Sequence, residues 1–346
     1  MTFKICVIGC GFHAFRVHGP SYRKYANNYD NVELTACCDV KATKAQEFKE
    51  EFNFNRYYTD IDKMLKQEEP DAVCLLVSEN LIAPLSIKIL EKGYPLFLEK
   101  PPGLNKDETI DMLKIANKNS VPHQVGFNRR FIPLIEKFID IFTKNFKNRS
   151  RIQNIKYDLF RVDRMDADFA ATAIHGIDTV KFLADTKYQK VNFEYQKFPE
   201  LGDKAENIYL NCQFDSGITA QINFCPVSGV VIERIVINCY NSTFFINLPI
   251  WNKFDFPGEL IWVKKNEVKF KIRGDELIDS GKLYITNGFY RENVNFFEKL
   301  RHSEYPQANI ESALQSVEIS DCIRKRKRVF EDNNFNHKHE GIRYYD

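Results

Sequence analysis

The chain has 346 residues, of which 44% are hydrophobic and 28% are charged, and its formal net charge is +2. This length predicts two domains, the composition allows a sizeable hydrophobic core, and the near-neutral charge gives no reason to expect nucleic-acid binding. The chain enters a strand without a signal peptide, and no apolar run approaches membrane-spanning length. We therefore expect a cytoplasmic protein that does not bind membranes.

The nine cysteines are expected to be reduced. Most of them lie inside predicted strands, and none stands in a C-x-x-C pair or at the Cys/His spacing of a metal site. These features are typical of core thiols in a cytosolic protein, so we expect neither disulfides nor a bound metal.

The first predicted strand, residues 5–8, is followed by the spacing of the dinucleotide fingerprint, G-x-G-x-x-G/A. Gly9 permits a tight turn, Gly11 has no Cβ and lets a diphosphate approach the backbone, and Ala14 allows close packing of the next helix. The helix N-terminus offers N–H groups and a positive dipole end to the phosphates. A simple Gly-rich turn is the alternative, but the preceding strand and the acid that ends the next strand favour dinucleotide binding.

A second predicted strand, residues 32–38, ends at Asp39. Asp39 lies about 25 residues after the loop, close to the place of the acid that binds the adenosine ribose hydroxyls. A carboxylate here repels a 2′-phosphate and favours NAD, although Lys41 and Lys44 leave NADP possible. Asp39 can also act as a helix N-cap, and the two roles are compatible.

Strands and helices alternate up to about residue 126, which predicts a doubly wound parallel sheet of the Rossmann type in an N-terminal domain, residues 1–124. Further strands are expected at 57–59, 71–77, 96–99 and 121–126, and helical segments at 14–25, 42–52, 61–65, 81–92 and 107–117. Ligands of such sheets bind at the carboxyl ends of the strands. These ends hold Gly9, Asp39, Ser78, Lys100 and Asn128.

From about residue 127 the pattern changes to successive strands with few helices, which predicts an α+β domain, residues 125–346, with a large, mainly antiparallel sheet. Strands are expected at 152–161, 191–198, 207–214, 218–224, 230–239, 243–248, 260–264 and 268–272. Helices are expected at 131–146, 171–183, 290–300 and 310–324. Asn309 is the expected N-cap of the last helix, and the basic run 324–328 is interpreted as its solvated C-terminus.

Four motifs occur in order: Gly-Cys-Gly-Phe-His-Ala at 9–14, Glu-Lys-Pro-Pro at 99–102, Gly-Phe-Asn-Arg-Arg-Phe at 126–131 and His-Gly-Ile-Asp at 175–178. Together they resemble the glucose–fructose oxidoreductase / inositol dehydrogenase / rhizopine catabolism (Gfo/Idh/MocA) family over nearly the whole chain. The resemblance implies a Rossmann domain, a C-terminal domain with a large open sheet, and a nicotinamide cofactor. It also implies a sugar, sugar derivative or cyclitol as substrate, and a homodimer or homotetramer formed through that sheet.

The same motifs and strand ends imply the residues that bind the cofactor. These are Gly9, Gly11, Phe12, His13, Ala14, Asp39, Ser78, Glu99, Lys100, Asn128 and Arg129. Arg129 and its neighbour Arg130 can approach the cofactor or form salt bridges, and we favour a structural role for Arg130.

Hydride transfer from a secondary alcohol leaves a hydroxyl proton that a group titrating near neutrality must accept. His175 is the expected base, with an ordinary pKa of roughly 6.5. Asp178 lies three residues later on the same helical face and is expected to orient the imidazole or bind a substrate hydroxyl. Lys100 precedes two prolines that make its backbone rigid, and its ammonium can stabilise charge on the reacting oxygen.

Two arginines, Arg161 and Arg164, lie shortly before the helix of His175 and are candidates for the substrate pocket. A guanidinium there suits a carboxylate or phosphate on the substrate. We therefore expect the substrate to be bound by Lys100, Arg161, Arg164 and His175.

Two positions depart from the family pattern. Members often carry an aspartate four residues before the histidine and a glycine two residues before it, whereas this chain has Ala171 and Ala173. Either Asp168 or Asp178 compensates, or His175 works without a carboxylate partner, or the protein is not an ordinary dehydrogenase.

Three functions therefore stay open. The leading hypothesis is an NAD(P)-dependent dehydrogenase or reductase that acts on a CH–OH group. A second is an enzyme that uses tightly bound NAD transiently for sugar hydrolysis or epimerisation. A third, which Ala171 favours, is a dinucleotide-binding regulator without catalysis; the retained Lys100 and His175 argue against it.

Overall fold

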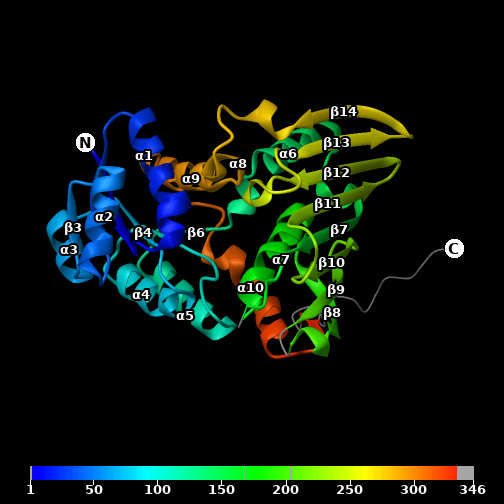
Figure 1. Cartoon of the computed structure of the whole chain (residues 1–346), viewed down its shortest axis with the longest axis horizontal. Helices are drawn as coiled ribbons and strands as arrows, with labels where there is room; N and C mark the ends of the chain where they lie inside the picture. Colours follow the sequence, from blue (N-terminus) through cyan, green and yellow to red (C-terminus); the bar gives the residue numbers. More distant parts are fainter. Residues whose placement is uncertain (1, 167, 203–204, 333–346) are drawn as a thin grey trace.

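Two β-sheets with their helices make up the described part of the chain (Figure 1). The computed structural model describes residues 2–166, 168–202 and 205–332. The first sheet comes from the blue and cyan part of the chain, and the second sheet comes from the green and yellow part except for its edge strand near the red end. This arrangement confirms the predicted fold class.

The first sheet has six parallel strands in the order β3-β2-β1-β4-β5-β6. The strands are β1 (Phe3–Ile8), β2 (Val32–Cys38), β3 (Arg56–Tyr58), β4 (Ala72–Leu75), β5 (Leu96–Leu98) and β6 (His123–Val125). This is the strand order of a Rossmann fold, in which the direction of winding reverses between β1 and β4. Ligands of such sheets bind at that reversal.

Both faces of the first sheet are buried, which explains its continuous apolar runs. In β1, Ile5 and Val7 enter one core and Cys6 and Ile8 enter the other. The helices of this part are α1 (Gly19–Asn28), α2 (Ala42–Phe52), α3 (Ile61–Glu68), α4 (Glu79–Glu91) and α5 (Lys106–Lys118). The helix expected at 14–25 differs in detail, because a π-helical turn, η1 (Ala14–His18), precedes α1.

The second sheet has nine strands in the order β14-β13-β12-β11-β7-β10-β9-β8-β15. They are β7 (Ile152–Phe160), β8 (Tyr188–Lys197), β9 (Glu206–Phe214), β10 (Thr219–Cys225), β11 (Ile232–Cys239), β12 (Ser242–Leu248), β13 (Glu259–Lys264), β14 (Glu267–Arg273) and β15 (Val329–Glu331). Neighbouring strands are antiparallel except β7 and β10, which are parallel. The edge strand β15 was not predicted; it follows the basic run 324–328, which is mostly exposed as expected.

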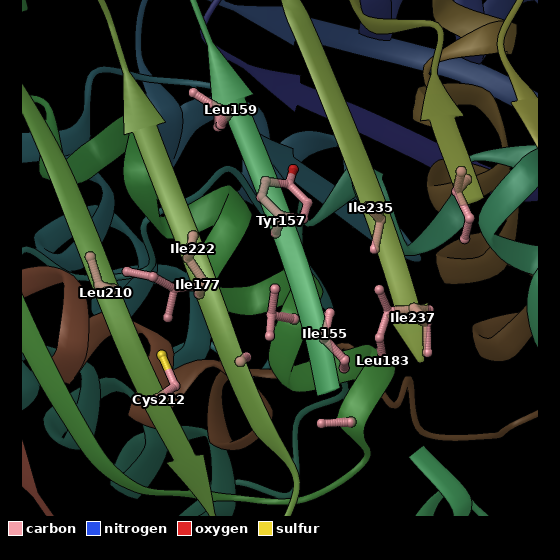
Figure 2. Close-up of a cluster of buried hydrophobic side chains, with 14 of the residues drawn as sticks. Ile155, Tyr157, Leu159, Ile177, Leu183, Leu210, Cys212, Ile222, Ile235 and Ile237 are labelled. Atoms are coloured by element: carbon pink, nitrogen blue, oxygen red, sulfur yellow. The ribbon is translucent and has the colours of Figure 1, made fainter. Parts of the chain in front are cut away.

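Two helices, α6 (Pro133–Asn145) and α7 (Ala170–Ala184), contribute to the core of the second sheet. Figure 2 shows Ile177 of α7 lying among side chains of the strands, including Tyr157 and Ile222. Gly176 allows this close approach, because a Cβ there would lie 2.8 Å from the ring of Phe224. The helix that carries His175 is therefore held against the sheet.

Helices from the end of the chain pack on the first sheet. Phe296 and Phe297 of α9 (Phe289–Arg301) join one of its cores, and Ile310 of α10 (Ile310–Arg324) joins the other. Asn309 caps α10 as predicted, since its Oδ1 accepts a hydrogen bond from the Ser312 amide at 2.9 Å. The domain boundary at 124/125 stays a prediction, but α9 and α10 complete the layers of the first domain.

The remaining helical segments are short. They are η2 (Asn128–Phe131), η3 (Arg149–Arg151), η4 (Pro199–Leu201), η5 (Ile250–Asn252), η6 (Gly274–Leu277) and α8 (Leu283–Thr286). All nine cysteines are free, and seven are buried, as expected for core thiols. Among the described residues no helix has the length and apolar character needed to cross a membrane.

Candidate active site

A cavity of about 690 Å³ lies where β1, β4 and β5 end, and residues of both predicted domains line it. Among the residues from the first domain are Phe12, His13, Ser78, Glu99 and Lys100. Among those from the second are Asn128, Arg129, Arg161, Arg164, His175 and Trp251. Most of the residues predicted for cofactor and substrate therefore surround one space.

The glycine loop has the geometry that dinucleotide binding requires. Gly9 has a φ of +96°, and a Cβ there would lie 2.3 Å from the Leu76 carbonyl oxygen, so only glycine fits. A Cβ on Gly11 would meet nothing within 4 Å, which leaves an open approach for a diphosphate. Ala14 is 1% exposed at the start of the helix. These positions fit a dinucleotide phosphate.

Asp39 shapes the loop from the end of β2. Its Oδ2 accepts a hydrogen bond from the Cys10 amide at 2.9 Å, and its Oδ1 accepts one from the Lys41 amide, also at 2.9 Å. Asp39 is not the N-cap of α2, as the sequence allowed; that position is Lys41, and Asp39 binds its amide from two residues earlier. Each carboxylate oxygen has a further lone pair, so these contacts leave capacity for ribose hydroxyls.

A buried hydrogen-bond network lies beneath the loop. His18 Nε2 is 2.7 Å from Glu99 Oε1, and His13 Nε2 is 3.5 Å from the same oxygen. Asn293 donates to the Phe289 carbonyl, which orients its amide so that Nδ2 also donates to His18 Nδ1 at 3.2 Å. We therefore assign the His18 proton to Nε2, which donates to Glu99.

This assignment bears on metal binding. Ligand atoms of His13, His18 and Glu99 all lie within 4.8 Å of one another, as in a metal site. A metal ligand needs a free lone pair, however, and the His18 nitrogen that faces Glu99 carries a proton. Burial would raise the pKa of Glu99, but the hydrogen bonds of the two histidines lower it well below its ordinary value. The geometry thus favours an ionised, hydrogen-bonded carboxylate, and the absence of a metal stays a prediction.

Lys100 connects the first domain to α7. Its Nζ donates a hydrogen bond to the Ala171 carbonyl at 3.0 Å. In an α-helix this carbonyl also accepts the amide of His175, so the ammonium lies one helical turn from that residue. Burial is the main cause that lowers the pKa of Lys100; Glu99 acts in the opposite direction, and Arg129 lowers it further. A backbone carbonyl thus contacts Lys100 at the position where relatives often have an aspartate.

His175 is 9% exposed and lies close to Arg129, whose Nη1 is 3.4 Å from His175 Nε2. A guanidinium only donates, so we assign the His175 proton to Nδ1, which has no hydrogen-bond partner. Burial, followed by the positive charges of Arg129 and Lys100, lowers the pKa of His175 well below its ordinary value. The imidazole is therefore neutral at pH 7.

Glu233, which was not predicted, organises the wall of the second domain. Its carboxylate accepts hydrogen bonds from Arg129 at 2.8 and 3.2 Å, and also from Arg161 and the Tyr157 hydroxyl. Burial would raise the pKa of Glu233, but the two guanidinium groups lower it to about 2. The sequence did hold a signal for this burial. Glu233 lies two residues before Ile235 in β11, so both side chains are on the same, inward face of the strand.

The structure corrects the expectation for Asp178. Asp178 does not line the cavity; it is 1% exposed and accepts a hydrogen bond from Arg130 Nε at 2.8 Å. Asp168 accepts one from Arg324 Nη2 at 2.6 Å. Neither acid therefore replaces the missing aspartate, and among the described residues His175 has no carboxylate partner. The structural role favoured for Arg130 agrees with its contact.

Arg164 and Asn128 also line the cavity, and each already donates a hydrogen bond to another residue of the protein. Arg164 Nε donates to Asp166 at 2.8 Å, and the Asn128 amide donates to the Asn287 carbonyl at 2.8 Å. Phe12 is 78% exposed. Trp251 was missed by sequence reasoning because no motif marks it.

Comparison with known proteins identifies related sequences and folds. The model of an oxidoreductase family with an NAD-binding Rossmann fold, Gfo/Idh/MocA, matches residues 3–127. An uncharacterized protein of Saccharomyces cerevisiae is 27% identical over 135 residues, which is 38% of this chain and 38% of that protein. Inositol 2-dehydrogenase of Corynebacterium glutamicum is 22% identical over 235 residues, which is 64% of this chain and 66% of that enzyme. The match thus spans less than two thirds of each relative.

A solved structure of levoglucosan dehydrogenase in complex with NADH is similar over nearly the whole length. The TM-score is 0.79 with 15% identity, and the match covers 96% of this chain and 99% of that one. At this identity the similarity shows a common fold.

Proposed function

The chain belongs to the Gfo/Idh/MocA family of oxidoreductases, and on this basis we propose that it is an NAD(P)-dependent dehydrogenase or reductase. In this proposal it transfers a hydride between nicotinamide and a secondary alcohol or ketone of a sugar, sugar derivative or cyclitol. The inositol and levoglucosan dehydrogenases among its relatives support this substrate class. The observation that carries the proposal is the meeting of Lys100 and His175, from different domains, at one cavity beside the glycine loop.

The proposed cofactor is NAD, with NADP as the alternative. The open approach at Gly11 supports binding of the diphosphate, and Asp39 supports binding of ribose hydroxyls rather than a 2′-phosphate. Lys41 and Lys44 keep NADP open. When bound, the cofactor accepts or supplies the hydride through its nicotinamide ring.

Lys100 and His175 handle the proton of the reacting hydroxyl in this proposal. One N–H of the ammonium is bonded to the Ala171 carbonyl, which leaves the others for the reacting oxygen. The lone pair of neutral His175 is on Nε2, and it accepts the hydroxyl proton when the substrate hydroxyl displaces the Arg129 N–H, which is 3.4 Å away. The neighbouring positive charge of Lys100 stabilises an alkoxide on the substrate.

Replacement of Lys100 by methionine tests the assignment. We expect turnover to fall roughly 10²- to 10⁴-fold, because a group that positions and exchanges a proton is lost, while NADH affinity changes little. Activity is found first by screening sugars and cyclitols for an absorbance change with NAD and NADP. Lys114→Met, at an exposed lysine of α5, is the matched control. Near-normal turnover of Lys100→Met would remove Lys100 from the mechanism.

The same preparation separates the two alternative functions. Protein that purifies with bound cofactor, and converts sugars without added cofactor, would be an enzyme of the hydrolysing or epimerising kind. Protein that binds NADH but oxidises nothing in the screen would favour a regulator.

We also propose that the protein is cytoplasmic and forms a homodimer or homotetramer through the second sheet. Along β9 and β10 of that sheet, buried side chains alternate with exposed or half-buried ones, so one face is open among the described residues. Light scattering after gel filtration would measure the mass of the assembly.

A further inference from the structure

The walls of the cavity contain more positive charge than their carboxylates neutralise. Arg129 and Arg161 are each 3% exposed, yet both bind the single carboxylate of Glu233. Lys100 is a third cation, and Glu99 is the second carboxylate. Three cations therefore face two buried carboxylates, while the third acid of the lining, Glu79, is exposed and its charge is screened by solvent.

A third buried acid nearby does not change this excess. Glu292 is 0% exposed, and neither of its carboxylate oxygens has a hydrogen-bond partner. Burial, with the negative charge of Glu99, raises the pKa of Glu292 well above its ordinary value. Burial and Glu99 thus both favour the neutral form of Glu292, which makes it a poor counter-charge for the cations of the wall.

Two nitrogen atoms of the cavity wall are buried without a partner. They are Nε of Arg161 and Nδ1 of His175, and both residues line the cavity. A guanidinium Nε always carries a hydrogen, and a buried donor without an acceptor is unfavourable. An oxygen atom of a bound molecule would satisfy it.

The mouth of the cavity adds two cations that have no carboxylate partner among the described residues. Arg16 contacts only aromatic rings, with its guanidinium carbon 4.8 Å from the centre of the Trp251 ring and 5.8 Å from that of Phe12. Lys253 forms no ion pair, and both residues line the cavity. Their field attracts an anion.

The diphosphate of the cofactor accounts for only part of this charge. It is expected at the glycine loop, residues 9–14, close to Arg16 in η1, whereas Arg161 and His175 belong to the residue after β7 and to α7. The oxidised nicotinamide ring is itself positively charged. Binding of NAD therefore increases the need for a negative group on the other ligand.

We propose that the substrate carries an acid group, a carboxylate or a phosphate, and that Arg161 binds it through its unpaired Nε–H. The substrate class is then a sugar acid or a sugar phosphate. This inference rests on the proposed function, because it concerns the second ligand of the same cavity. The acid group restores charge neutrality beside His175, which allows the imidazole to take up the hydroxyl proton.

Binding of matched sugars tests the inference without requiring turnover. Isothermal titration calorimetry would compare D-glucose, D-glucuronate and D-glucose 6-phosphate, and the corresponding galactose series, on the protein with and without NADH. We expect at least one acid to bind roughly 10- to 100-fold more tightly than the neutral sugar with the same ring. The carboxylate and phosphate arms show which acid group the site prefers.

Arg161→Met should reduce the affinity for that acid to the level of the neutral sugar and leave NADH binding unchanged. Folding should tolerate this change, since it leaves Arg129 and Glu233 as a one-to-one pair. Arg161→Lys is the second variant: it keeps the charge but lacks the guanidinium N–H groups, so it should recover part of the affinity. Arg151→Ala, at an exposed arginine of η3, is the charge-matched control.

The inference is overturned if no acid binds more tightly than its neutral counterpart, if no acid binds at millimolar concentration, or if Arg161→Met leaves the preference intact. These results would not touch the proposed function, which is judged by NADH binding and by turnover of Lys100→Met. Failure of NADH to bind would instead remove the proposed function. The binding of acids to the protein without NADH would still decide whether the site prefers an acid group.

Discussion

Two buried glutamates, one from each predicted domain, support the walls of the cavity and differ in their partners. Glu99 is 7% exposed and faces two histidines, the nearer being His18 at 2.7 Å. Glu233 is 0% exposed and faces two arginines. Both carboxylates have a lowered pKa, but for different reasons.

The difference concerns the charge of the partners. A guanidinium stays protonated at all relevant pH values, so the network of Glu233 keeps its excess positive charge. Burial lowers the pKa of the His18 imidazole below its ordinary value, although Glu99 opposes this, so the nearest partner of Glu99 is neutral at pH 7. The contrast suggests a division of roles, in which the arginine wall binds an anion and the histidine network supports Lys100.

The largest effect is expected for Glu233→Gln. The substitution leaves Arg129 and Arg161 as buried charges without a carboxylate, which should lower the free energy of unfolding by about 3–5 kcal/mol. Urea unfolding at pH 7 measures this change. Glu267→Gln removes an exposed carboxylate that pairs with Lys269 and should leave stability nearly unchanged, because solvent screens that pair. Equal effects of the two variants would contradict the assigned importance of the buried network.

Glu99→Gln should have a smaller effect, about 1–3 kcal/mol at pH 7, because its nearest partner, His18, is neutral and Lys100 keeps its hydrogen bond to the Ala171 carbonyl. The pKa of Glu99 is lowered in the folded protein, so its contribution is present above the ordinary value of 4.5 and is lost as the pH falls below it. The stability difference between wild type and variant should therefore shrink below about pH 4.5. Urea unfolding from pH 7 to pH 3.5 would show this, and a constant difference would contradict an ionised Glu99.

The smallest effect is expected for His13→Gln. The His13 ring lies 3.5 Å from Glu99, and its side chain is 41% exposed, so the interaction is weak and screened by solvent. The free energy of unfolding at pH 7 should change by less than about 1 kcal/mol. A loss as large as that of Glu99→Gln would mean that His13, and not only His18, holds the carboxylate.

Much of the first domain was predictable because its signals are local. Gly9 needs a positive φ wherever this loop forms, and the capping residue Asn309 bonds an amide only three residues away. Helix and strand periodicity placed most of the elements within a few residues of their observed bounds. Such features depend on neighbours in sequence, and therefore appear in the sequence itself.

The roles of the acids near His175 were not predictable in the same way. Helical spacing placed Asp178 on the same helix as His175, but spacing does not say what packs against it, and Arg130 forms its ion pair there. For Glu233 the period-2 pattern of β11 indicates burial, yet its partners Arg129 and Arg161 lie 104 and 72 residues away.

The glycine loop, the strand–helix alternation and the places of Lys100 and His175 at element ends could be predicted from the chain alone, because turns, caps and periodicity are short-range properties of the backbone. Which charges meet depends on how distant elements pack. The tertiary structure pairs Glu99 with His18 and Glu233 with two arginines, and it places Lys100 one helical turn from His175. Pairings of this kind arise when distant segments pack against each other, and the unneutralised charge that they leave at the cavity appears only in the folded protein.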